Sequence, residues 1–174
     1  MTRSVKMLCV LGAGIALFVV LSLCLQVPVF ENYYLCLGYA VMLVYCYSLG
    51  PWPGVLVGAL GVVLYCLLTS GLRGMPGWSL GNVVIGLGLG FGLQPIRKIE
   101  NRALKAGAAV VLIIVVTAAG ILGVKSLTEH ILYAQPFMVR AAKNFTAFVA
   151  DAVMLAVSIP IAELLDKRVR KLVE

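Results

Sequence analysis

Two polar residues in the last apolar stretch of the chain are the clearest candidates for chemistry. Asp151 lies eight residues into a predicted membrane span over 143–164, and Asn144 precedes it by seven residues. Seven residues are about two helical turns, so both side chains project from one face. An aspartate near mid-helix costs about 2.5–3.5 kcal/mol on insertion-based scales, so it faces a partner or a wet cavity. The sequence leaves open whether Asp151 contacts a ligand or pairs structurally, with Arg140 or Lys143 as partners nearer the surface.

A second polar group occupies a link between two apolar spans. The segment 71–82 reads GLRGMPGWSLGN and contains Arg73, Trp78 and Asn82. Its glycines and proline favour turns, which predicts a hinge. An arginine can pair a polar substituent, an asparagine can hydrogen-bond ring heteroatoms, and a tryptophan can stack on a ring. We interpret the segment as a lid that closes over a small polar ligand.

Further polar residues are predicted on the same side of the membrane. Asn32 and Tyr39 lie near the start of the second span, and His130 lies in the link before the last span. Tyr39 is expected to stack with Trp78 on an aromatic ligand, although tyrosines at such positions also form interfacial belts. The predicted substrate-binding residues are therefore Asn32, Tyr39, Arg73, Trp78, Asn82, His130, Asn144 and Asp151.

The sequence contains no constellation typical of an enzyme. It has no nucleophile–base pair, no zinc-ligand cluster and no phosphate loop, so we expect no catalysis, metal or cofactor. The five cysteines lie in apolar spans without a C-x-x-C pair and are interpreted as packing residues. The alternating glycines of 86–92 mimic a dinucleotide fingerprint, but no predicted strand precedes them. We expect them to pack helices against each other.

The composition places these residues in a bilayer. The chain of 174 residues is 62% hydrophobic and 12% charged, with a mean hydropathy of +1.06. A spanning helix needs about 20 apolar residues. We therefore predict an all-α integral membrane protein with a single domain over 1–174, a compact bundle of six transmembrane helices. The predicted spans are 5–26, 33–50, 54–70, 79–96, 106–125 and 143–164. An odd number of spans is the main alternative, because the second and third are short.

The basic residues predict the topology. Ten of the fourteen Lys and Arg residues fall at three chain segments that six spans place on one side of the membrane. By the positive-inside rule, that side is the cytoplasm and both termini lie there. We expect a multi-pass protein of the bacterial plasma membrane, and no nucleic-acid partner. The ten residues are Arg3, Lys6, Arg97, Lys98, Arg102, Lys105, Lys167, Arg168, Arg170 and Lys171.

The first span carries small residues at helical spacing. Gly12 and Ala16 form a small-x-x-x-small pair, and Ala13 lies beside them. Such a face lets another helix approach closely. An external partner and packing within the bundle are equally compatible with this pattern.

Three segments carry a resemblance to a known family. They are 31–39 (ENYYLCLGY) with the Gly54/Gly58 helix, 73–82 (RGMPGWSLGN), and Asn144 through Asp151 to the basic tail. They resemble the substrate-binding S components of energy-coupling factor (ECF) vitamin transporters, and most closely the hydroxymethylpyrimidine- and pyridoxine-type members. The resemblance implies six helices with cytoplasmic termini, and an outward pocket that captures a vitamin or precursor.

The resemblance also implies partners. S components of this type dock onto a transmembrane coupling subunit served by two ATPase subunits, and topple in the bilayer to deliver their ligand. The family's A-x-x-x-A is present here as Gly12-x-x-x-Ala16, which departs at its first position. Two alternatives from other classes stay open. One is a membrane scaffold or assembly protein that binds helices through its glycine faces, and the other is a stand-alone secondary transporter whose ion dependence is tied to Asp151.

Overall fold

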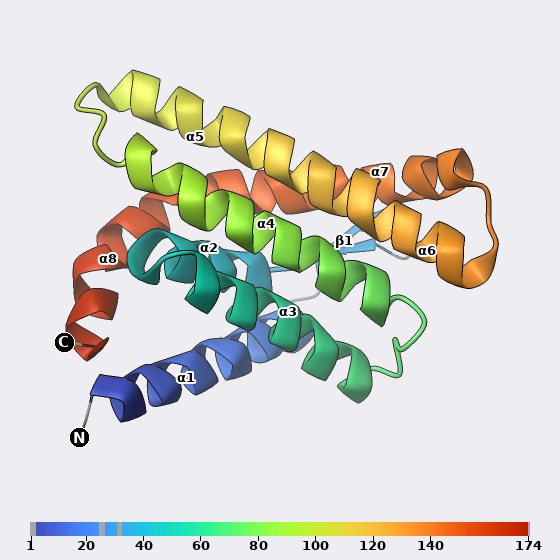
Figure 1. The fold of residues 1–174 in the computed structure, drawn as a ribbon, viewed down its shortest axis with the longest axis horizontal. Coiled ribbons are helices and arrows are strands. Elements are labelled where there is room, and N and C mark those ends of the chain that lie inside the picture. The colour runs from blue at the N-terminus through green and yellow to red at the C-terminus, as the bar shows by residue number, and fades with distance from the viewer. Residues whose placement is uncertain (1–2, 25–26, 31–32, 174) are drawn as a thin grey trace.

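The computed structural model describes residues 3–24, 27–30 and 33–173, which form helices joined by short links and one small hairpin (Figure 1). Both chain ends lie at one end of the molecule with the α4–α5 link, and we call this the basic end. The α3–α4 and α6–α7 links lie at the other, which we call the distal end (Figure 1). The elements are α1 (Arg3–Cys24), β1 (Val27–Phe30), β2 (Tyr33–Leu35), α2 (Gly38–Leu49), α3 (Pro51–Leu68), α4 (Met75–Ile96), α5 (Arg102–Thr117), the π-helix η1 (Ala118–Lys125), α6 (Ser126–Tyr133), α7 (Phe137–Val157) and α8 (Ile159–Val173).

The short helix α2 forms the centre of the core. Ten of its twelve residues are buried, which is the behaviour of a helix that is hydrophobic all round. Phe18 of α1 meets Tyr39 edge to face at 6.2 Å between ring centroids. Leu89 of α4 and Leu155 of α7 are fully buried in the same core cluster. The other helices therefore enclose α2.

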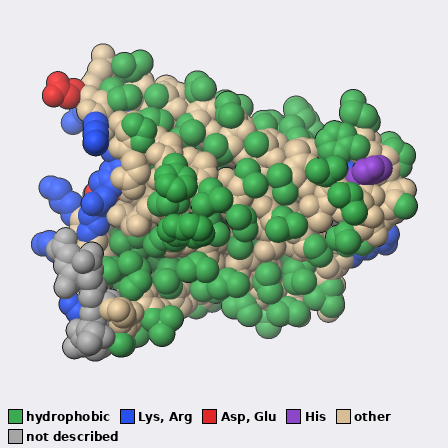
Figure 2. Space-filling model, viewed as in Figure 1, with side chains coloured by type: hydrophobic (Ala, Val, Ile, Leu, Met, Phe, Trp, Pro, Cys, Tyr) green, Lys and Arg blue, Asp and Glu red, His purple; other side chains and the backbone are tan. Residues whose placement is uncertain are grey.

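Several helices have the length and composition of membrane spans. Within the described residues, four qualify: Ser4–Cys24, Pro51–Leu68, Met75–Ile96 and the continuous stretch Arg102–Tyr133. The pair α7 and α8 qualifies only together, which brings the number to five. Large apolar side chains also cover the flank seen in Figure 2, whereas Lys and Arg gather at the basic end. The chain is an integral membrane protein with a largely helical fold.

The glycines of α4 pack that helix against its neighbours, which confirms the role expected from their spacing. A Cβ at Gly90 would overlap the Cα of Pro51 in α3, and one at Gly92 would lie 2.5 Å from Leu112 in α5. Real Cβ contacts are not this short. The absence of side chains at these positions therefore lets α3 and α5 approach α4 closely.

The second predicted span begins in a different place. The prediction makes residues 33–35 helical, but they form β2, which pairs antiparallel with β1. Val27 lies opposite Leu35 and Pro28 opposite Tyr34. The sequences VPVF and YYL are rich in β-branched and aromatic residues, which favour strands. The helix starts only at Gly38.

Two predicted turns are in fact helix starts. The proposed lid is helical from Met75 onward, with Pro76 in the first turn of α4, so the link itself covers only 69–74. Pro51 likewise begins α3, and the single residue Gly50, with φ 98°, separates it from α2. A proline suits these positions because the first turn of a helix leaves its N–H groups unpaired.

The last two predicted spans also differ from the helices observed. The stretch Arg102–Tyr133 is longer than the predicted 106–125 because η1 continues α5 into α6. The predicted 143–164 is interrupted where α7 meets α8 at a bend of 54°. Pro160 lies just after this bend, and a proline removes one backbone donor and clashes with the preceding turn.

Candidate functional site

A buried chain of hydrogen bonds joins three helices near the distal end. Trp78 on α4 donates from its indole Nε1 to the hydroxyl of Tyr39 at 2.8 Å. That hydroxyl donates to Asn82 Oδ1 at 2.7 Å, and Asn82 Nδ2 donates to the Gly58 carbonyl of α3 at 3.0 Å. Tyr39 and Asn82 are fully buried. Their polar atoms are mutually satisfied, which is what a buried polar group requires.

A buried carboxylate lies next to this chain. Asp151 of α7 is 6% exposed, and its carboxylate lies beside the Tyr39 hydroxyl. Lys125, at the end of η1, supplies the opposing charge. A buried carboxyl group with these neighbours can orient a polar substituent of a ligand, because polar interactions are strong away from water. The group Tyr39, Trp78, Asn82, Lys125 and Asp151 is called the distal polar cluster below.

Asn144 lies about two turns before Asp151 on α7 and belongs to a neighbouring hydrogen-bond network. Its Nδ2 lies 3.0 Å from Ser126 Oγ and 3.0 Å from Glu129 Oε2. Glu129 is buried and faces Arg140, with 3.8 Å between Oε2 and the guanidinium. The Nε of Arg140 is buried without a hydrogen-bond partner among the described atoms. This network ties α6 to α7 next to the distal polar cluster.

Neither of the two basic residues considered as structural partners of Asp151 lies beside it. The sequence offers Arg140 and Lys143, but Arg140 pairs with Glu129 and Lys143 is exposed. Both lie two to three turns before Asp151 on the same helix, too far along the axis to reach it. On the neighbouring helical stretch, Lys125 is the basic residue that acts electrostatically on Asp151, although no ion pair joins these two described residues.

Arg73 and His130 are exposed near the distal end and do not join the buried cluster. Arg73 is exposed, and its guanidinium lies 4.9 Å from the ring centroid of Tyr133, whose hydroxyl donates to the Arg73 carbonyl oxygen. Arg140 approaches the same ring at 5.9 Å. His130 is exposed and pairs through Nδ1 with the Gln135 carbonyl at 2.5 Å. The contacts of Tyr133 tie the α3–α4 link to the end of α6.

Of the remaining predicted residues, Asn32 lies outside the described part of the chain. The sequence also failed to predict three residues that contribute to these two networks. Lys125 reads as the last residue of a predicted span, and Ser126 and Glu129 read as polar residues of the link after it, yet all three lie within one continuous helical stretch. The spacing of Lys125 and Glu129, four apart, could have signalled a common helix face.

The small residues of α1 form an exposed helix face. Gly12, Ala13 and Ala16 are exposed, and a Cβ at Gly12 would meet no described atom within 4 Å. Gly14 lies on the opposite side, where a Cβ would come within 2.5 Å of the Tyr45 ring. The helix thus packs on α2 with one side and leaves its small-residue face uncovered by the rest of the described chain.

Comparison with known protein families identifies the chain. Residues 2–167 match the family model described as "ECF-type riboflavin transporter, S component". The chain belongs to this family of ECF S components. S components are substrate-binding subunits for transport and not enzymes, and they work with a membrane coupling subunit and ATPases.

Two curated relatives match part of the chain. A UPF0397 protein of Lactococcus lactis subsp. cremoris (strain NZ9000) is 37% identical over 95 residues, which cover 53% of this chain and 50% of the relative. The UPF0397 protein YdcD of L. lactis subsp. lactis (strain IL1403) matches to the same extent. The match thus spans about half the length of these curated relatives.

A solved structure supports the fold. The S component for biotin from an ECF-type ABC transporter superposes with a TM-score of 0.68, covering 96% of this chain and 95% of that one. At 16% identity this similarity concerns the fold alone.

Proposed function

We propose that this S component captures a small heteroaromatic vitamin or vitamin precursor at the distal polar cluster. The observation that carries the proposal is the buried chain Trp78–Tyr39–Asn82 with Asp151 beside it. An indole and a phenol offer aromatic surface to a ring, while the amide and carboxylate offer hydrogen bonds to its heteroatoms. Sites of this kind are mostly apolar with a few convergent polar groups.

The proposed ligand is a pyridoxine- or pyrimidine-like compound. A ring of that size can reach Trp78, Tyr39 and Asn82 together, because these side chains are directly hydrogen-bonded to one another. Asn144 and Asp151 would bind its polar substituents, and Asn32, Arg73 and His130 would contribute further contacts. Riboflavin is the alternative, since the family description carries that name.

We further propose six spans in a bacterial plasma membrane, with both termini in the cytoplasm and the distal polar cluster facing outward. The basic end then lies on the side that the positive-inside rule requires. The twelve-residue α2 would be the sixth span, since it is enclosed by longer helices and need not match the bilayer thickness itself.

Delivery would proceed on a coupling subunit that binds the open face of Gly12, Ala13 and Ala16. Two ATPase subunits would supply the energy, and the S component would topple with its ligand toward the cytoplasm. Small residues permit the backbone approach that such helix docking needs.

Tryptophan fluorescence tests the ligand. The chain has two tryptophans, and Trp52 is 68% exposed, so Trp52→Phe leaves Trp78 as the only tryptophan emitter. Titration of this variant with pyridoxine, hydroxymethylpyrimidine, riboflavin and biotin is expected to give saturable quenching by one of the two small rings at sub-micromolar concentration. Saturation by riboflavin or biotin alone would transfer the assignment to that compound. Flat titrations with all four would contradict the proposal.

A further inference from the structure

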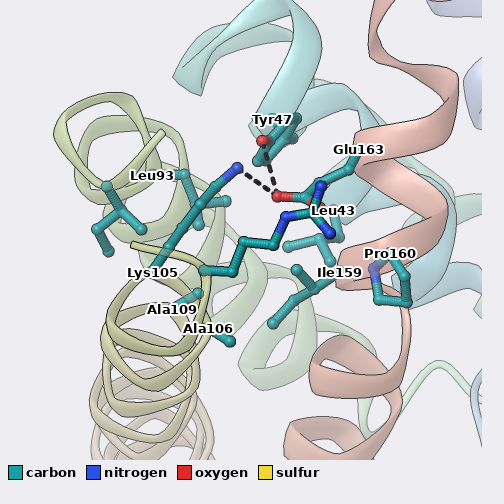
Figure 3. Close-up of a pocket in the computed structure, with 11 residues that line it drawn as sticks. Leu43, Tyr47, Leu93, Lys105, Ala106, Ala109, Ile159, Pro160 and Glu163 are labelled. Atoms are coloured by element: carbon teal, nitrogen blue, oxygen red, sulfur yellow. Dashed lines mark hydrogen bonds and ion pairs between the residues drawn. The ribbon is translucent and has the colours of Figure 1, made fainter. Parts of the chain in front are cut away.

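A cleft lies at the basic end, at the opposite end of the molecule from the distal polar cluster. It has a volume of about 600 Å³, which falls in the range of about 300–1,000 Å³ found for ligand sites. Residues from α2, α4, α5 and α8 line it, with α5 and α8 forming its two sides (Figure 3). None of the residues proposed for vitamin capture lines it.

The cleft has an apolar wall and a charged rim. Ala106 and Ala109 of α5 face Ile159 and Pro160 of α8 across it, with Leu43 of α2 at its floor (Figure 3). The charged side chains that line it are Arg102, Lys105 and Glu163. Two cations therefore meet one anion at the rim.

Glu163, the anion at the rim of the cleft, already has partners. Glu163 forms an ion pair with Lys105 and accepts a hydrogen bond from the Tyr47 hydroxyl at 3.4 Å (Figure 3). Lys105 also lies 5.9 Å from the centroid of the Tyr47 ring. Arg102 is exposed and forms no ion pair or hydrogen bond with any described residue. One positive charge at the mouth of the cleft is therefore left over for an anion.

The surroundings of the cleft decide which anion fits. Ala106 of α5 and Pro160 of α8 line the cleft and are themselves exposed, and Val110 on the next turn of α5 is 37% exposed, so the outer edge of the cleft is apolar. The cleft thus lies where an apolar belt meets a basic end, and its occupant needs an anionic head and an apolar tail. Basic pockets between membrane helices are typical sites for anionic lipid headgroups.

We propose that the α5–α8 cleft binds an anionic phospholipid. Its phosphate lies at Arg102 and Lys105, and one acyl chain enters along Ala106, Ala109 and Ile159. The lipid would fill the space between α5 and α8 and hold the bent helix α8 against the bundle from the membrane side. This site is independent of the vitamin site.

Native mass spectrometry of the full-length purified protein tests the proposal with defined lipids. Phosphatidylglycerol is expected to be retained as a single bound molecule, and more strongly than phosphatidylcholine. Arg102→Gln is expected to weaken retention about fivefold, since one charge near an anionic headgroup contributes about 1 kcal/mol. Arg168→Gln is the matched control, because Arg168 is exposed on α8 outside the cleft. It is expected to leave retention unchanged.

A second variant tests the acyl chain. Ala106 is exposed, so Ala106→Phe is expected to fill the cleft and abolish retention while keeping the thermal-unfolding midpoint of the parent. Millimolar inorganic phosphate is expected not to displace the lipid, because it lacks the tail. Equal losses for Arg102→Gln and Arg168→Gln, equal retention of phosphatidylcholine, or displacement by phosphate would each overturn the proposal.

Discussion

Gly81 on α4 and Gly120 in the π-helix η1 are in direct backbone contact. A Cβ at Gly120 would lie 2.7 Å from the Gly81 carbonyl oxygen, and a Cβ at Gly81 would lie 2.8 Å from that of Gly120. Two glycines therefore let α4 and η1 approach more closely than any other residue type would allow. Asn82 follows one of them and Lys125 lies five residues after the other. The contact fixes the spacing of two helices that supply the distal polar cluster.

Adding a methyl group at this contact should separate the two helices. We expect Gly120→Ala to lower the free energy of unfolding by about 1–3 kcal/mol, the usual cost of overpacking. Thermal unfolding in detergent measures this loss. Gly123→Ala is the control in the same π-helix, because its Cβ would come no closer than 4.0 Å to the Ala118 carbonyl oxygen. Equal stability of the two variants would contradict the contact.

The amide of Asn82 bridges α2 and α3, since it accepts from Tyr39 and donates to the Gly58 carbonyl. Asn82→Ala removes both of these hydrogen bonds, although the Tyr39 hydroxyl keeps its bond from Trp78, and each lost bond costs about 0.5–1.5 kcal/mol. We expect a lower unfolding midpoint together with weaker ligand quenching of Trp78. Gln94→Ala on the exposed side of α4 should change neither quantity. An unchanged midpoint for Asn82→Ala would show that the bridge is dispensable.

Arg97 fastens α8 to the core at the basic end. Its guanidinium donates to the Tyr47 carbonyl at 2.6 Å and to Asp166 at 2.7 Å, and it stacks 4.5 Å from the Tyr47 ring centroid. We expect Arg97→Gln to destabilise this attachment by about 1–3 kcal/mol, because hydrogen bonds to charged groups are lost. Hydrogen exchange of the α8 amides should then become faster.

The matched variants for Arg97 separate charge from geometry. Arg97→Lys keeps the charge but cannot reproduce a planar fork that stacks and donates in two directions, so we expect little rescue. Lys98→Gln removes a neighbouring exposed charge and should leave exchange unaltered. Full rescue by lysine would mean that the charge alone holds α8.

The exposed face of α1 should matter for assembly and not for folding. We expect Gly12→Leu to preserve the unfolding midpoint and to abolish co-purification with a coupling subunit and its ATPases, because a bulky side chain blocks close helix approach. Gly107→Leu on α5 is the matched control, since a Cβ added at either glycine would have no described atom within 4 Å. Retention of the complex by Gly12→Leu would place the docking surface elsewhere.

Most features of a helical membrane protein could be predicted here from composition and residue spacing alone. Long apolar runs identify a membrane protein, because a bilayer admits few structures other than apolar helices. The alternating glycines of α4 predict close helix packing, and that packing is observed. The burial of Asn144 and Asp151 on one helix follows from their seven-residue spacing. These properties depend on local periodicity, which a sequence displays directly.

The helix boundaries and the partners of the polar groups depended on the tertiary structure. The strand at 33–35 exists because β1 pairs with it, and that pairing is not visible in a run that reads as apolar helix. Asp151 faces Lys125 instead of Arg140 because η1 brings a residue 26 positions earlier in the chain next to α7. Sequence alone determined which residues must be buried or hydrogen-bonded. Only the packing of separate helices decided which of them meet, since such contacts join positions that no local period relates.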